Sequence, residues 1–101
     1  MSACLLGIDI GTSACKIAIF DRGGQVLSAA TKDYPVYYPH PGWAEQNPEE
    51  WWTAVCQAIK EALRQGKIDP GEIAGVGIDG QSWSAIAVDE DGRILANTPI
   101  W

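Results

Sequence analysis

Residues 7–16 read GIDIGTSACK, in which an apolar run carries Asp9 into a tight Gly-Thr-Ser turn. The chain then returns along a second apolar run, KIAIF, over residues 16–20. Short apolar runs bounded by glycine and serine are typical of β-strands. We therefore predict a β-hairpin whose tip gathers a carboxylate, two hydroxyls and a nearby lysine.

The groups at this tip suit a phosphate anion. Backbone amides of a glycine-containing turn form an anion-binding nest, and Gly11, Thr12 and Ser13 would supply such amides together with two hydroxyls. Asp9 is a candidate ligand for a hydrated Mg²⁺ beside the phosphates, and Lys16 would offset their negative charge. An ordinary hairpin, in which the glycine only permits the turn, explains the same residues, and the stretch alone leaves both interpretations open.

The size and charge of the chain limit the classes of protein it can represent. Its 101 residues, 47% of them hydrophobic, suffice for one small domain, and the net charge is −6. The basic residues are scattered and form no positive stripe, which argues against nucleic acid or an anionic membrane as a partner. No apolar run approaches the roughly 18–20 residues that span a bilayer. The N-terminus also lacks the pattern of a signal peptide.

The cysteines indicate a reduced, cytoplasmic protein. Cys4, Cys15 and Cys56 are odd in number and widely spaced, so neither a disulfide framework nor a zinc site is predicted. We expect all three to act as small core residues. Cys15 lies beside the predicted phosphate turn and is a candidate for alkylation.

A helix is predicted after a proline-containing loop over residues 34–42. Asn47 is a suitable N-cap, Pro48 suits the first helical position, and Glu50 completes a capping-box pattern. Gly66 ends the helix. The apolar stripe predicted to pack on the sheet consists of Trp52, Val55, Cys56, Ile59 and Leu63, with Trp51 beside it.

The residues just before this helix have a structural explanation. Trp43, Glu45 and Gln46 are interpreted chiefly as packing at the helix entry, with a hydrophobic staple. His40 stands between two prolines and is interpreted as a surface residue of the loop.

The order of the elements predicts a mixed α/β sheet. The apolar runs at 5–10 and 74–79 can lie parallel to each other, joined by a right-handed crossover through the helix. Both would then end at the edge where open α/β sheets bind ligands. The turn after Asp9 and the turn after Asp79 would flank one cleft.

The chain contains two similar units, at residues 7–29 and 76–96. Each reads as a strand that ends in aspartate, a polar tip, a second strand, an Asp-x-x-Gly turn and a third strand. In the later unit the second and third strands are expected at 84–88 and 93–96. A remote duplication and two β-meanders with the same turn chemistry explain this pattern equally.

Three motifs resemble those of one enzyme family. DIGTS at residues 9–13, followed by a basic residue, resembles the first phosphate motif of the sugar kinase, Hsp70 and actin superfamily. PGWAEQNPEEWW at 41–52 resembles the segment that opens the first helix of FGGY carbohydrate kinases. GIDGQSW at 77–83 resembles the sugar-contacting loop of the same family. The matches occur in the family's order and cover nearly the whole chain.

The resemblance implies a ribonuclease H-like mixed sheet. It places residues 1–101 in the N-terminal part of the first kinase domain, with the rest of that domain and the second domain absent. It also implies that the catalytic aspartate follows residue 101, so the fragment alone is expected to be inactive. ATP with Mg²⁺ is the expected cofactor, a small-molecule sugar is the expected partner, and a homodimer is left open.

The substrate contacts implied by the resemblance lie in the third motif. In FGGY kinases the side chains after the Gly-Gln step meet substrate hydroxyls, which assigns this role to Gln81, Ser82 and Trp83. Asp79 is a further candidate, which could instead cap the turn. Within the family, this loop resembles that of xylulokinases. Xylulokinases commonly carry Met-His after the glutamine, whereas this chain carries Ser82-Trp83, so the identity of the sugar stays open.

The function implied by the resemblance is ATP-dependent phosphorylation of a ketopentose such as D-xylulose. Kinases for gluconate, ribulose, glycerol or another polyol are alternatives within the family. Two other classes are Hsp70- or actin-like conformational ATPases and a noncatalytic module in which the turn is only structural. The sequence WAEQNP at 43–48 argues against the conformational ATPases, because it resembles FGGY kinases specifically.

Overall fold

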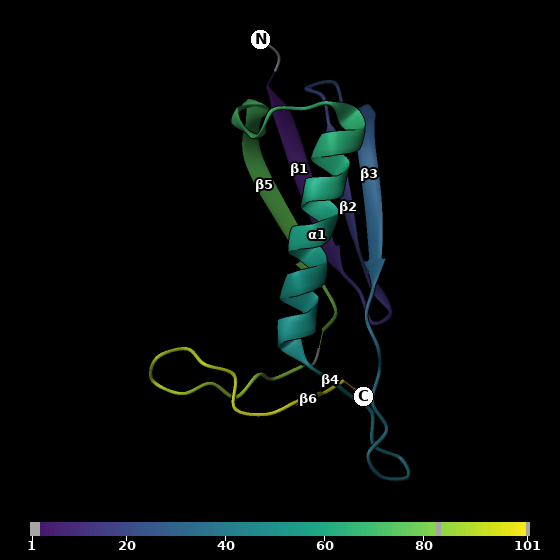
Figure 1. Cartoon of the computed structure of the whole chain (residues 1–101), viewed down its shortest axis with the longest axis vertical. Coiled ribbons are helices and arrows are strands. Elements are labelled where there is room, and N and C mark those ends of the chain that lie inside the picture. The colour runs from purple at the N-terminus through teal and green to yellow at the C-terminus, as the bar shows by residue number, and fades with distance from the viewer. Residues whose placement is uncertain (1–2, 83, 101) are drawn as a thin grey trace.

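A computed structural model describes residues 3–82 and 84–100 of the chain. One long helix lies across a four-stranded sheet, whose strands follow the order β3-β2-β1-β5 (Figure 1). The strands are β1 (Cys4–Ile10), β2 (Ala14–Phe20), β3 (Val26–Asp33) and β5 (Ile73–Gly80). The helix, α1, spans Pro48–Gly66.

The strand pairing confirms the predicted hairpin and the predicted parallel strands. β2 pairs antiparallel with both β1 and β3, whereas β5 pairs parallel with β1. The connection from the hairpin to β5 passes through α1. Because Asp9 lies opposite Asp79 and Ile10 opposite Gly80, β1 and β5 end at the same edge of the sheet.

A second, two-stranded sheet lies beyond that edge, close to the start of α1 (Figure 1). It pairs β4 (Glu45–Gln46) with β6 (Thr98–Pro99) in antiparallel fashion. A 3₁₀ turn at Pro70–Glu72 leads from α1 into β5. Among the described residues, no helix has both the length and the apolar character needed to cross a membrane.

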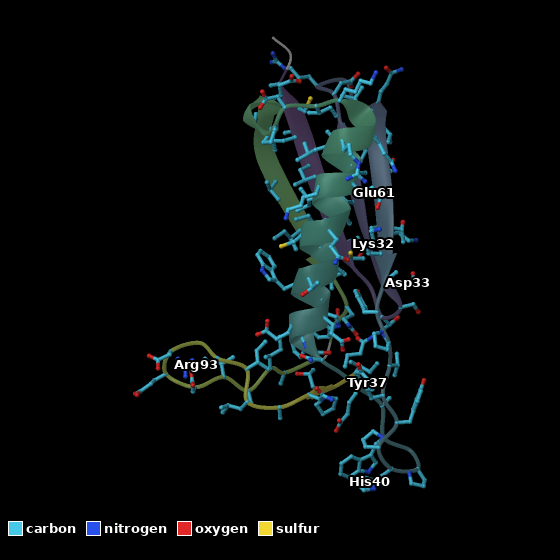
Figure 2. All side chains as sticks on the ribbon, viewed as in Figure 1. Lys32, Asp33, Tyr37, His40, Glu61 and Arg93 are labelled. Carbon is cyan, nitrogen blue, oxygen red and sulfur yellow. The ribbon has the colours of Figure 1, made fainter. Side chains whose placement is uncertain are left out.

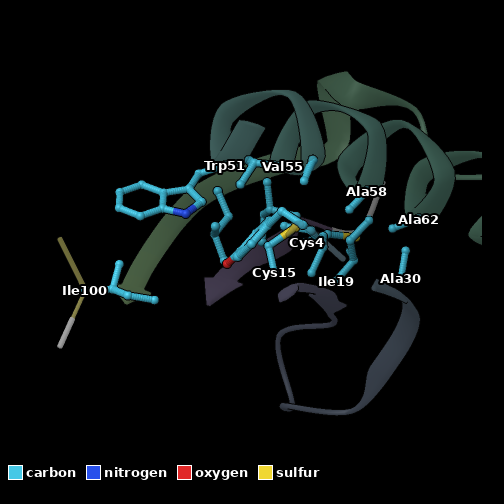
Figure 3. Packing of buried hydrophobic residues seen from close by; sticks show 14 of the residues in the cluster. Cys4, Cys15, Ile19, Ala30, Trp51, Val55, Ala58, Ala62 and Ile100 are labelled. Carbon is cyan, nitrogen blue, oxygen red and sulfur yellow. The ribbon is translucent and has the colours of Figure 1, made fainter. Parts of the chain in front are cut away.

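The core lies between α1 and the sheet face that it covers. Alternate residues of β1 and β2 point into this core, as expected for strands with one buried face. Figure 3 shows small helix residues set against them, including Ala58 and Ala62. The buried strand residues are Cys4, Leu6, Ile8, Cys15, Ile17 and Ile19.

The predicted helix stripe is partly confirmed: Val55 is buried and Ile59 and Leu63 pack against the core, but Trp52 does not belong to it. Trp51 is buried at 9% exposure, whereas Trp52 is 66% exposed. The side chains that face the sheet around Val55 are largely alanines, which let the helix approach the strands closely. A stripe chosen from the largest apolar side chains overlooks such positions, although alanine is frequently buried.

The start of α1 confirms the predicted N-cap but not the capping box. Oδ1 of Asn47 accepts a hydrogen bond from the amide of Glu49 at 3.0 Å, and Pro48 occupies the first turn. The carboxylate of Glu50 does not return to the cap. Instead, its Oε1 accepts from the hydroxyl of Tyr37 at 2.9 Å, which ties the preceding loop to the helix.

The helix ends at Gly66 as predicted, but for a different reason. The left-handed residue of the terminal Schellman motif is Lys67, with φ of 53°, and its amide donates to the carbonyl of Arg64 at 3.2 Å. Gly66 is required by packing, because a Cβ there would lie 2.8 Å from Cβ of Ser28. Ser28 also donates to the Ala62 carbonyl at 2.7 Å, so β3 and α1 are in close contact.

A single ion pair adds to this contact on the surface. Nζ of Lys32 on β3 lies 2.8 Å from Oε2 of Glu61 on α1, and Figure 2 shows both side chains between the two elements. The hydrogen bond and the positive charge of Lys32 hold the pKa of Glu61 below its usual range.

The second of the two similar units does not form its predicted strands. After β5, residues 84–88 and 93–96 meet only in one isolated bridge between Val88 and Ile94. The Asp-x-x-Gly turn is nevertheless the same in both units: Oδ1 of Asp21 and Oδ1 of Asp89 each accept from two amides of their own turn. Local turn chemistry is therefore shared, but among the described residues the later segment pairs with neither sheet.

Candidate functional site

The two polar turns meet at one edge of the sheet, as the predicted topology requires. The amide of Gln81, just after β5, donates to the carbonyl of Ile10 at the end of β1 over 2.8 Å. The turn at Gly11–Ser13 therefore lies beside the loop that begins at Gln81. Ligands of open α/β sheets bind at this type of edge.

The turn after β1 leaves amide groups available. Its geometry is closed by the amide of Gly11, which donates to the carbonyl of Ala14 at 3.0 Å. A Cβ at Gly11 would lie 3.1 Å from that same oxygen, so the turn is tight at this residue. Among the described residues, the amides and hydroxyls of Thr12 and Ser13 donate no hydrogen bond. These are donors of the kind that bind a phosphate.

The carbonyl oxygens of the same turn accept hydrogen bonds from residues elsewhere in the protein. The hydroxyl of Tyr34 donates to the Gly11 carbonyl, and the amide of Tyr34 donates to the Ser13 carbonyl at 3.2 Å. Nε2 of Gln46 donates to the Thr12 carbonyl at 2.6 Å. Three consecutive carbonyl oxygens thus have partners inside the protein. A phosphate would be repelled by these oxygens if they faced it.

Tyr34 is suited to this role by its environment. Its side chain is buried at the end of the core. Burial, together with the negative charges that Cys15 and Asp9 can carry, raises the pKa of Tyr34 to about 12. The hydroxyl therefore keeps its proton at physiological pH and remains a donor to the Gly11 carbonyl.

Gln46 is the residue that sequence reasoning missed. Its predicted packing at the helix entry is confirmed, since it is 1% exposed and bonded to Trp51 of α1, but its contacts with both turns are not part of that prediction. Its Oε1 accepts from the indole nitrogen of Trp51 at 3.0 Å and from Nε2 of Gln81 at 3.0 Å. In the sequence, the two residues that form β4, Glu45–Gln46, are too short a stretch to distinguish a strand from a loop.

The hydrophobic staple predicted for Trp43 is wrong. Trp43 is 54% exposed, and its ring meets His40 edge-on with centroids 4.5 Å apart. Figure 2 places His40 at the far end of the loop, which confirms that it is a surface residue. The pair therefore lies away from the two turns.

Three charged residues line a hollow of about 490 Å³ on the sheet face that α1 leaves uncovered. Asp9, Lys16 and Asp79 lie on neighbouring strands, and Asp9 is opposite both of the others in register. Asp9 is exposed, and its carboxylate makes no hydrogen bond to the described residues. Oδ1 of Asp79 accepts from the Gly80 amide at 2.8 Å, in agreement with its interpretation as a turn cap.

The sugar-loop candidates are only partly brought together. Gln81 points inward to Gln46, and its Oε1 is buried without a hydrogen-bond partner among the described residues, as is Oγ of Ser84. Ser82 is exposed. Trp83, the third candidate, lies outside the described residues.

Within the part of the chain that the structure describes, no three potential metal ligands cluster together. A single exposed carboxylate at Asp9 still fits a hydrated Mg²⁺, which usually takes one or two carboxylates and completes its shell with water and substrate phosphates. Cys15 is fully buried, and burial raises the pKa of its thiol, so the expected alkylation at this residue is not favoured.

Comparison with known proteins gives one consistent result. The model of the FGGY family of carbohydrate kinases, N-terminal domain, matches residues 4–101. A glycerol kinase from Thermococcus gammatolerans is 40% identical over 101 residues, which are all of this chain and 20% of that protein. The chain therefore spans about a fifth of the length of the curated relatives it matches.

Solved structures agree with the family match. A gluconate kinase from Lactobacillus acidophilus has a TM-score of 0.89 at 30% identity, over 98% of this chain and 20% of that one. A ligand-bound xylulose kinase from the same organism has a TM-score of 0.87 at 31% identity, over 96% of this chain and 19% of that one. These values confirm the expected mixed sheet with one helix as part of a sugar-kinase fold.

Proposed function

Since the chain belongs to the FGGY family of carbohydrate kinases, we propose that it is the N-terminal part of an ATP-dependent kinase that phosphorylates a small sugar or polyol. The observation that carries this proposal is the meeting of the Gly11–Ser13 turn with Gln81 at one sheet edge. One turn offers free amides and the other an amide side chain, so the two suit a phosphate and a hydroxylated substrate respectively.

In this proposal the turn binds the terminal phosphates of the nucleotide. Gly11, Thr12 and Ser13 supply amides and hydroxyls, and Lys16 offsets the phosphate charge. Asp9 would hold a hydrated Mg²⁺, and the ion would supply electrostatic stabilisation of the transferred group. Phosphoryl transfer depends mainly on such positioning and on charge stabilisation.

The substrate would lie against the loop that starts at Gln81. Its buried Oε1 has no donor among the described residues, and a substrate hydroxyl is a donor of the required type. Ser82, Trp83 and Asp79 would add further contacts. We place the carboxylate that accepts the substrate proton after residue 101, and we therefore expect the 101-residue fragment to be inactive.

Two substrate classes are proposed in order. The resemblance of residues 77–83 to xylulokinases favours a ketopentose such as D-xylulose. The identity of 40% to a protein named glycerol kinase favours glycerol as the second candidate. A conformational ATPase is disfavoured, because the family match covers residues 4–101.

The proposal is tested by ADP release from the full-length protein with D-xylulose, D-ribulose, glycerol and D-gluconate. We expect turnover that one of these substrates stimulates, and none from the 101-residue fragment. Asp9→Asn should reduce turnover at least tenfold, while Asp91→Asn, a matched change in a distant exposed loop, should not. Slow ATP hydrolysis that no substrate stimulates would overturn the proposed function.

A further inference from the structure

One buried amide group joins the two halves of the candidate site. The side chain of Gln46 reaches the Thr12 carbonyl with its nitrogen and Gln81 with its oxygen. The two partners belong to different turns, one after β1 and the other after β5. Gln46 itself is held in β4 by pairing with Thr98 of β6, so its backbone has little freedom to follow either turn separately.

The partners of Gln46 permit only one orientation of its amide. A backbone carbonyl only accepts, and Nε2 faces the carbonyls of Thr12 at 2.6 Å and Pro35 at 3.5 Å. An indole nitrogen only donates, and Trp51 donates to Oε1. The reverse orientation would set oxygen against oxygen and N–H against N–H.

This orientation determines how Gln81 lies. Because Oε1 of Gln46 is an acceptor, Gln81 presents its own Nε2 to it at 3.0 Å, and the same Nε2 donates more weakly to the Gly11 carbonyl at 3.5 Å. The carbonyl oxygen of Gln81 is then directed away from Gln46 and has no partner among the described residues. Gln46, together with the Gly11 carbonyl, thus determines which atom of Gln81 is left without a partner among the described residues.

The same amide controls the phosphate turn. By accepting from Nε2 of Gln46, the Thr12 carbonyl is kept on the inner side of the turn, while the amides of Thr12 and Ser13 have no partner within residues 3–82 and 84–100. A buried polar group that loses its partner is costly, so the turn and Gln81 cannot move independently of Gln46 without breaking one of these bonds.

We infer that Gln46 is a positioning residue that couples the phosphate turn to the sugar loop, so that nucleotide binding at the turn orders the loop through Gln81. The inference rests on the function proposed above. It assigns no contact between Gln46 and either substrate. The effect of Gln46 is instead on the coupling between the two turns, that is, on how strongly the loop after β5 responds to a ligand bound at the turn after β1.

The test measures two quantities in the full-length protein with ADP and Mg²⁺ as the probe. Calorimetry gives the ADP affinity, and hydrogen exchange gives the protection of peptides spanning residues 9–16 and 78–86. Gln46→Met keeps the length of the side chain but removes its donor and acceptor. Asn47→Ala is the matched control, because it removes a neighbouring cap that contacts neither turn.

We expect ADP to slow exchange in both peptides of the wild-type protein. In Gln46→Met the ADP affinity should fall at least fivefold, and the protection of 78–86 should disappear. Asn47→Ala should lower the melting temperature while leaving affinity and both protections unchanged. A purely structural role for Gln46 predicts the behaviour of this control instead.

A second variant keeps the inference testable if Gln46→Met does not fold. Gln81→Met leaves the bonds from Gln46 to Thr12 and Trp51 in place, so ADP should bind within twofold of wild type without protecting 78–86. Retained protection of 78–86 in either variant would overturn the inference alone. Failure of the wild-type protein to bind ADP would overturn the proposed function, and the inference with it.

Discussion

Asp9 and Asp79 lie opposite each other in register on two parallel strands, at the edge where both strands end. Lys16 lies opposite Asp9 on the other side, so the three charges form a row across β5, β1 and β2. All three line the hollow on the uncovered face of the sheet. Asp9, in the middle of the row, therefore has one negative and one positive neighbour.

We expect different effects on ADP affinity when Asp9 or Asp79 is replaced by asparagine in the full-length protein. Asp9→Asn removes the candidate magnesium ligand and should weaken binding of ADP with Mg²⁺ at least tenfold, or about 1.4 kcal/mol. Asp79→Asn keeps the acceptor oxygen for the Gly80 amide and should change that affinity less than twofold. Calorimetry with Mg²⁺ and with a chelator separates the effects, since without the metal Asp9→Asn should resemble the wild type. An equal loss in both variants would contradict the assignment of Asp9.

Because α1 lies close to the sheet, we expect larger side chains on its buried face to lower the free energy of unfolding. Ala58 is fully buried against the strands, so Ala58→Leu should lower the free energy of unfolding by about 1–3 kcal/mol. The matched change Lys60→Leu on the exposed face should alter it by less than about 0.5 kcal/mol. Denaturant unfolding of the full-length protein measures both, and equal effects would show that the face of the helix is assigned wrongly.

The end of α1 predicts opposite effects for two adjacent residues. Gly66→Ala should destabilise by about 1–3 kcal/mol, because the new Cβ meets Ser28, even though alanine favours a helix by about 1 kcal/mol. Lys67→Gly should stabilise by about 1 kcal/mol, because glycine adopts the left-handed conformation without strain. Thermal unfolding provides the measurement, and Lys67→Ala, which retains a Cβ at the strained residue, is the control. If Gly66→Ala stabilised the protein, β3 would have to shift away from the new methyl group, and the packing requirement for glycine would be contradicted.

We expect the folded protein to lose stability at alkaline pH, as the hydroxyl of Tyr34 loses its proton. Burial first, and then the charges of Cys15 and Asp9, raise its pKa from 10.0 to about 12. Because the folded pKa lies above the unfolded one, the neutral hydroxyl contributes its full stability below about pH 10 and loses it as the pH rises towards 12. Tyr34→Phe should therefore be destabilised relative to wild type at pH 8, and this difference should shrink by pH 11. A difference that does not depend on pH would contradict the raised pKa.

Local features of the fold followed from short-range sequence patterns. The hairpin around Gly11, the N-cap at Asn47 and the two Asp-x-x-Gly turns each depend on residues within a few positions of one another. The parallel pairing of β1 with β5 was also predictable, because a strand–helix–strand order has few permitted connections. The predicted strands at 84–88 and 93–96 were wrong, since strand patterns require a neighbouring edge that the sequence does not specify.

The candidate site, like the fold, was only partly predictable from the sequence. The turn after β1 and the loop after β5 each carry a motif that is visible in the sequence, and the sheet topology brings them to one edge. The roles of Tyr34 and Gln46 were not visible, because each depends on hydrogen bonds to residues 23 or more positions away. The exposure of Trp52 and the burial of Ala58 and Ala62 were missed for a related reason, since the distance between α1 and the sheet determines which side chains fit there.

Sequence alone was sufficient for the family, for the hairpin and for the parallel pairing of β1 with β5, because these depend on residue types at short spacing or on the few permitted connections between strands. The packing of Ala58 and Ala62, the exposure of Trp52 and the buried amide of Gln46 emerged from the folded chain. Each of these requires atoms from separate elements to compete for the same space or the same hydrogen bond. Such competition is resolved when the helix and the sheet come together, and no local pattern encodes its outcome.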